Sequence, residues 1–152
     1  MAIYTLQREQ LVPRPLEEVF GFFSDARNLQ KITPPWLNFQ ILTAEPIDIQ
    51  PGTLLDYRLK WHGLGIRWRT RIVTWTPPHA FTDEQIRGPY HLWHHTHTFT
   101  AEAGGTRMVD VVNYQLPLGI LGAIAHRLAV RRDLECVFDY RRQAIACLFS
   151  SP

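Results

Sequence analysis

Two stretches of alternating apolar and polar residues around a glycine turn constrain the fold of this chain more than any other feature. The apolar positions are Leu55, Tyr57, Leu59 and Trp61 before the turn and Ile66, Trp68, Thr70 and Ile72 after it. Gly63-Leu64-Gly65 forms the turn. Because successive side chains of a strand point to opposite faces, this pattern predicts an antiparallel hairpin with one buried face and one solvated face.

A second hairpin is predicted from residues 90–100 and 106–116, which meet across Gly104-Gly105. With the turn at residues 102–105, the inward pairs are Phe99 with Met108, His97 with Asp110, His95 with Val112 and Trp93 with Tyr114. We therefore expect His97 and Asp110 to touch on the inward face of the sheet.

Proline positions delimit the helices. Pro15 can begin a short helix, and Ser24-Asp25 can cap a second one over residues 26–32. After Pro117, residues 118–149 contain no proline, and apolar side chains recur at a spacing of mostly three to four, at Leu121, Ile124, Leu128, Leu134, Phe138, Ile145 and Leu148. This predicts one long amphipathic helix. The order of elements indicates an α+β fold, in which a curved antiparallel sheet of about seven strands wraps around that helix and two short helices follow the first strand.

Composition favours one folded unit over residues 1–152, since the chain has 152 residues and 45% hydrophobic side chains. A net charge of +2 gives little support for nucleic-acid binding. We see no secretory signal and no apolar run of roughly 20 residues, so we expect a cytoplasmic protein without stable membrane insertion. The two cysteines, Cys136 and Cys147, lie about 16 Å apart along the predicted helix and cannot bridge each other.

Several segments together resemble one protein superfamily. They are residues 15–20, 28–29, 32–36, 88–90, 93–99 and 105–108, with Leu134 and residues 138–141. They resemble the helix-grip (SRPBCC) superfamily of START lipid-transfer domains, birch-pollen allergens and polyketide cyclase/dehydrase proteins, in a bacterial branch of mostly uncharacterised ligand-binding members. The resemblance covers essentially the whole chain and implies a deep apolar cavity between the sheet and the long helix. It implies no particular chemistry, because the same fold hosts carriers, receptors and enzymes.

The predicted contact between His97 and Asp110 has three interpretations. The pair can be structural, it can orient a hydroxyl or carbonyl of a ligand, or it can transfer a proton as the catalytic residues of an enzyme. His95 and His97 are also spaced to share a metal ion, with Asp110 as a third ligand. We expect no metal and no cofactor, because the sequence shows no second ligand cluster and no cysteine nearby.

The aromatic side chains predicted to face inward suit a planar or polycyclic ligand. Arg131 and Arg141 fall on or beside the apolar stripe of the long helix, where an arginine can clamp an anionic group. The predicted ligand-binding residues are Tyr57, Trp61, Trp68, Trp93, His95, His97, Asp110, Tyr114, Phe138 and Arg131. The hypothesis is binding of a hydrophobic or aromatic small molecule by a carrier, sensor or accessory protein. The alternative is a polyketide cyclase/dehydrase-like enzyme in which His97 and Asp110 transfer a proton.

Overall fold

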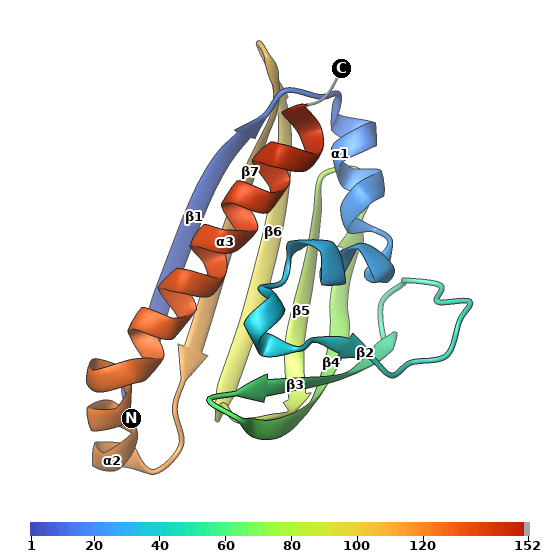
Figure 1. Cartoon of the computed structure of the whole chain (residues 1–152). Helices are drawn as coiled ribbons and strands as arrows, with labels where there is room; N and C mark the ends of the chain where they lie inside the picture. The colour runs from blue at the N-terminus through green and yellow to red at the C-terminus, as the bar shows by residue number, and fades with distance from the viewer. Residues whose placement is uncertain (151–152) are drawn as a thin grey trace.

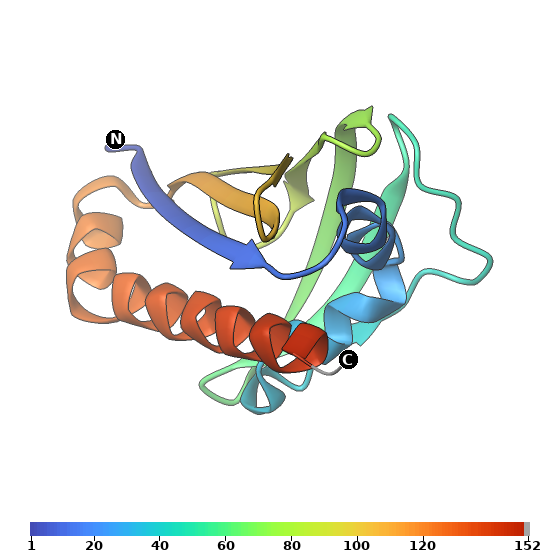
Figure 2. The ribbon, with the colours of Figure 1, turned by 90° about the horizontal axis from the view of Figure 1, so that it is seen from above.

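The computed structural model of the chain describes residues 1–150. Its strands are β1 (Tyr4–Val12), β2 (Gln40–Ile41), β3 (Leu54–Trp61), β4 (Leu64–Thr76), β5 (Ala80–Arg87), β6 (Leu92–Glu102) and β7 (Gly105–Gln115). They form one antiparallel sheet in the order β1-β7-β6-β5-β4-β3-β2. The C-terminal helix α3 (Arg131–Ser150) lies across this sheet, and the view from above shows the sheet curving around it (Figures 1 and 2). The predicted α+β helix-grip fold is confirmed.

Short helices follow the first strand, as predicted. Helix α1 (Leu16–Phe23) has Pro15 before its first turn and buries Leu16, Val19, Phe20 and Phe23. The second segment, η1 (Ala26–Ile32), is a 3₁₀ helix, and the Asp25 side chain caps it by accepting a hydrogen bond from the Arg27 backbone N–H at 3.0 Å. A further 3₁₀ turn, η2 (Pro35–Leu37), precedes β2.

The register predicted for the second hairpin is confirmed. The first hairpin also forms, but its turn is His62-Gly63, so Leu64 and Gly65, expected in the turn, lie in β4. Tyr57 pairs with Trp68 across β3 and β4. Across β6 and β7, His97 pairs with Asp110 and His95 with Val112. The histidines lie on the concave face because Phe99, which shares their side of β6, is anchored in the core.

The long C-terminal helical segment is continuous but changes its helical phase. Helix α2 (Gly119–Ala125) passes through a π-helical turn, η3 (His126–Val130), into α3. A π turn accommodates one extra residue and so rotates the helix by about 100° relative to an uninterrupted α-helix. Leu121, Ile124 and Leu128 were expected on the buried stripe but are 66%, 50% and 76% exposed. Leu148 is also exposed, and Phe149 is buried in its place.

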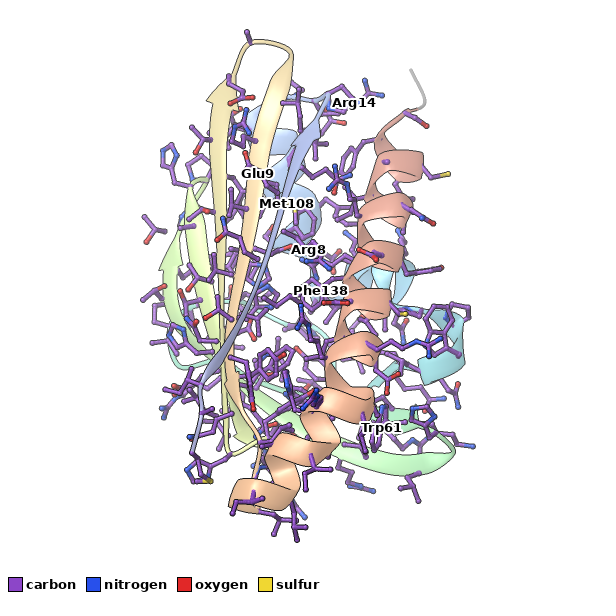
Figure 3. All side chains as sticks on the ribbon, turned by 90° about the vertical axis from the view of Figure 1, so that its left-hand side faces the viewer. Arg8, Glu9, Arg14, Trp61, Met108 and Phe138 are labelled. Atoms are coloured by element: carbon purple, nitrogen blue, oxygen red, sulfur yellow. The ribbon has the colours of Figure 1, made fainter. Side chains whose placement is uncertain are left out.

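The core is divided into three clusters, one of which contains Ala26, Leu55, Tyr57 and Ile72. Near α1, Phe20, Phe81 and Phe99 form edge-to-face and offset contacts, and Ile145 of α3 packs into the same cluster. A second cluster joins Trp93, Leu134 and Phe138. Phe138 projects from α3 into the space between helix and sheet (Figure 3). Because the core residues gather in separate clusters, the space between them is not completely filled.

The described residues contain neither a disulfide nor a helix that could span a membrane. Cys136 and Cys147 are both exposed free thiols, so they form no bridge with each other. Among the described residues, no helix is long and apolar enough to cross a membrane.

Gly105, at the start of β7, allows the close packing of β7 against the end of β1 to be tested. Its φ is +143°, and an added Cβ would lie 2.1 Å from the Val12 carbonyl oxygen. We expect Gly105→Ala to lower the free energy of unfolding by about 2–4 kcal/mol, because both strain and a backbone clash oppose the methyl group. Urea denaturation measures this change.

The matched control is Gly65→Ala, since a Cβ at Gly65 meets nothing within 4 Å and its φ is not in the left-handed region. This control should change stability by less than about 1 kcal/mol. Equal effects of the two substitutions would show that the β1–β7 contact at Gly105 is not tight.

Candidate functional site

A cavity of about 460 Å³ lies between the concave face of the sheet and the C-terminal helical segment. Seven of the predicted ligand-binding residues line it: Tyr57, Trp61, Trp68, Trp93, His95, His97 and Phe138. Leu121 and Gly122 of α2 line one edge, where Leu121 is also exposed to solvent. The alternation of the two hairpins thus brings most of the predicted site together.

Three predicted site residues do not line this cavity. Asp110 is buried behind the histidines. The Tyr114 hydroxyl lies 2.8 Å from Nε2 of His126, on the strand that pairs with β1. Arg131 is exposed and pairs with Glu135 at 3.1 Å, so the expectation of a ligand contact from Arg131 is corrected. Arg141 is the arginine of α3 that lines the cavity.

Aromatic rings form one wall of the cavity and hold one another in place. The ring of Trp68 meets that of Trp93 edge to face at 5.2 Å, and Tyr90 contacts both. The Trp61 indole N–H donates a 2.7 Å hydrogen bond to Oδ2 of Asp133 and so ties β3 to α3. Figure 3 shows Trp61 close to the first turns of α3. These contacts give a rigid wall in which the N–H group of Trp61 is already hydrogen-bonded.

Two histidines and two aspartates form a compact polar cluster at the cavity surface. Nε2 of His95 lies 3.1 Å from Oδ1 of Asp110, and Nε2 of His97 lies 2.9 Å from Oδ2 of Asp83. Nδ1 of His97 lies 2.9 Å from Oδ1 of Asp110, although not in hydrogen-bonding geometry. The two imidazole rings are 3.7 Å apart, so each carboxylate faces both histidines.

Asp83 is the site residue that the sequence analysis missed. It lies on β5 opposite His95, and Phe81, two residues earlier, lies opposite His97 and stacks on its ring at 4.0 Å. Alternation alone places Asp83 on the same face as Phe81, which is the signal that could have found it. Asp83, His95 and His97 are the described residues that come together as possible ligands for a metal ion.

Arg141 connects this cluster to α3. Its Nε lies 3.5 Å from Oδ2 of Asp110, and its guanidinium lies over the rings of Phe23 and Phe138. The side chain is buried, and its Nη2 has no hydrogen-bond partner among the described residues. The cluster therefore contains a permanent positive charge held between a carboxylate and two aromatic faces.

Burial and charge act on the pKa values of the cluster in opposite directions. Burial alone would raise the pKa of Asp110, but Arg141 and the two histidines outweigh it and hold that pKa well below its ordinary value. Burial would likewise raise the pKa of Asp83, but His97 and the other positive groups lower it. Burial lowers the pKa of His95. Burial would also lower the pKa of His97, but the carboxylates of Asp110 and Asp83 outweigh it and raise that pKa.

A comparison with models of protein families finds a match to this chain. The model described as polyketide cyclase / dehydrase and lipid transport matches residues 12–135. The comparison with curated protein sequences gave no significant match. The resemblance inferred from sequence segments is thus confirmed at the level of the superfamily.

Solved structures with the same fold include several of low sequence identity. A protein from Chromobacterium violaceum is 14% identical with a TM-score of 0.77, and the alignment covers 97% of this chain and 98% of that one. Ara h 8.0201 is 16% identical with a TM-score of 0.70, covering 99% and 100%. The di-domain ARO/CYC StfQ from the steffimycin biosynthetic pathway is 15% identical with a TM-score of 0.73, covering 97% and 51%. At these identities the similarity shows the fold alone.

Asp110 should contribute strongly to stability, because it is the carboxylate that compensates the buried charge of Arg141. We expect Asp110→Asn to lower the free energy of unfolding by about 3–5 kcal/mol, since it leaves a buried cation without its counter-ion. Thermal and urea denaturation measure the loss, and adding Arg141→Met to the same chain should restore part of it.

Asp139→Asn is the control, because Asp139 pairs with Arg8 at 3.4 Å on the surface and its side chain is 62% exposed. Its effect should stay below about 1 kcal/mol. If Asp110→Asn were as mild as this control, the charge pair would not hold α3 to the sheet.

Proposed function

Because the chain belongs to the polyketide cyclase / dehydrase and lipid transport family, we propose that it binds a hydrophobic or aromatic small molecule in its cavity as a carrier, sensor or accessory protein. The observation that carries this proposal is the cavity itself. Its volume of about 460 Å³ falls within the range of roughly 300–1,000 Å³ typical of small-molecule sites. Its lining is mainly apolar, with a few polar groups gathered at one place, which is also typical of such sites.

The arrangement of the lining indicates how a ligand would lie. Trp68, Trp93 and Tyr90 offer flat apolar surfaces that lose little conformational entropy on binding, because their rings already fix one another. His95, His97 and Asp83 lie at the polar end of the cavity. A planar ligand with one oxygen-bearing end would place its rings against the indoles and its oxygen beside the imidazoles.

The alternative function, proton transfer by His97 and Asp110 in a cyclase/dehydrase-like enzyme, is supported by the position of His97 at the cavity surface. The geometry favours binding over this alternative. Both ring nitrogens of His97 lie 2.9 Å from carboxylate oxygens, so neither is directed freely at a substrate proton. Turnover of a polyketide-like substrate that is lost in His97→Gln, with binding retained, would reverse this preference.

The positive charge of the sheet surface gives no support for a nucleic-acid partner. Arg69 pairs with Asp56, Arg71 with Glu84, and Arg107 with Glu102 and Glu9. A phosphate backbone would have to compete with these carboxylates for the paired arginines. The proposed partner is therefore a small molecule.

Filling the cavity should abolish binding of an aromatic probe. Ile66 lines the cavity opposite Leu59, so Ile66→Trp adds bulk where a ligand would lie. With 1-anilinonaphthalene-8-sulfonate as the probe, we expect saturable binding by the wild type with quenching of tryptophan fluorescence, and at least a tenfold weaker affinity in the variant. Fluorescence titration at equal protein concentrations measures both.

Val73→Trp on the same strand is the control, because Val73 is exposed and does not line the cavity. It should bind the probe as the wild type does. Equal binding by all three proteins would mean that the probe sits outside the cavity, and absence of any saturable binding would count against a ligand-accessible site.

A further inference from the structure

Asp83, His95 and His97 meet because neighbouring strands place them on one face. His95 and His97 are two residues apart on β6, so both point to the concave side, and Asp83 of β5 is the direct partner of His95. One ligand atom from each of the three lies within 4.8 Å of the others. His95 and His97 are buried and Asp83 is partly buried, so the group is shielded from most of the solvent.

We infer that Asp83, His95 and His97 form a binding site for a divalent transition-metal ion at the surface of the cavity. Oδ2 of Asp83 lies 2.9 Å from Nε2 of His97 and 4.0 Å from Nδ1 of His95. Ligand atoms of a tetrahedral zinc site, each about 2.1 Å from the metal, lie roughly 3.4 Å apart. The two distances lie on either side of this value, and all three ligand atoms lie within 4.8 Å of one another, so side-chain shifts of roughly an ångström bring the ligands into place.

The second ring nitrogens of His95 and His97 also bear on metal binding. Nε2 of His95 and Nδ1 of His97 lie 3.1 Å and 2.9 Å from the same oxygen of Asp110. A metal-binding histidine almost always directs its other ring nitrogen to a carboxylate, a carbonyl or water, which fixes the ring and increases its basicity. Here Asp110 occupies this position for His95, whereas it lies beside the corresponding nitrogen of His97 without a hydrogen bond to it, and Arg141 contacts its other oxygen. The rings therefore point their remaining nitrogens toward Asp83.

The position of the site determines what it can hold. Asp83, His95 and His97 line the cavity, whereas Asp110 lies behind them. Two imidazoles and one carboxylate suit zinc, iron, nickel or copper better than magnesium or calcium, which prefer oxygen ligands. Three protein ligands leave at least one coordination position directed into the cavity, where an oxygen atom of water or of a bound molecule can complete the shell.

The proposal differs from the sequence-based expectation of no metal, and the difference comes from one residue. That expectation depended on the lack of a further ligand near His95 and His97, with Asp110 as the sole candidate. The structure supplies Asp83 as a third ligand and places Asp110 where an outer carboxylate belongs.

The test uses Zn²⁺ and Co²⁺ with the whole chain purified in metal-free buffer. Competition with a chromophoric chelator should give one Zn²⁺ per chain, and Co²⁺ should produce visible absorption bands of a four- or five-coordinate ion. We expect His95→Gln, His97→Gln and Asp83→Asn each to weaken Zn²⁺ binding at least 100-fold. Asp110→Asn should weaken it about 10- to 100-fold, as expected for an outer-shell carboxylate.

His94→Gln is the matched control, because His94 is on the same strand but points to the opposite face. It should bind Zn²⁺ as the wild type does. Circular dichroism establishes that each variant is folded, and the stoichiometry and Co²⁺ spectrum of the wild type decide the matter even where a variant does not fold. Absence of stoichiometric binding by the wild type overturns the proposal, as does binding that survives both His95→Gln and Asp83→Asn.

The readout is metal binding alone, so it is separate from probe binding in the cavity. A protein that binds the fluorescent probe but no Zn²⁺ would contradict the metal site and leave the proposed function intact. A protein that binds Zn²⁺ but not the probe would contradict the proposed function and leave the metal site intact.

Discussion

The ion pair between Asp110 of β7 and Arg141 of α3 is the interaction on which the arrangement of the site depends. Both groups are buried, and burying either charge alone costs several kcal/mol. Each is therefore tolerated only where the other lies close to it. The pair fixes which face of α3 meets the sheet, and Leu134, Phe138 and Ile145, which share that face, pack accordingly. The histidines then find one carboxylate already oriented by the helix.

Strand register could be predicted from the sequence because a short glycine turn fixes it. Once the turn of the second hairpin is placed at residues 102–105, every inward pair follows, including His97 with Asp110. Asp83 could not be placed in the same way, since β5 joins β6 through residues 88–91 and its pairing with β4 is interrupted by register shifts. Alternation assigns Asp83 to a face but does not say which histidine it opposes.

The rotation of α2 relative to α3 was the other feature that the sequence pattern could not predict. A three-to-four spacing remains visible on both sides of the π turn, yet the extra residue rotates one side relative to the other. Extending the stripe of α3 backwards through the turn therefore assigns Ile124 and Leu128 to the wrong face, as their exposure shows. Arg131 lies beyond the turn, in α3 itself, so the phase change does not account for its exposure. The spacing alone did not distinguish exposed Arg131 from buried Arg141.

The exposed apolar residues at α2 and the polar cluster of Asp83, His95 and His97 form two unlike parts of the cavity lining. Leu118 and Leu121 line the cavity and are 74% and 66% exposed, so this part of the lining presents apolar surface to solvent. The imidazoles of His95 and His97 are buried, and there an unpaired polar group of the proposed ligand would be costly and a well-matched one would be held strongly. Because apolar surface can admit many ligands, selection among them in the proposed binding function would come from the polar cluster.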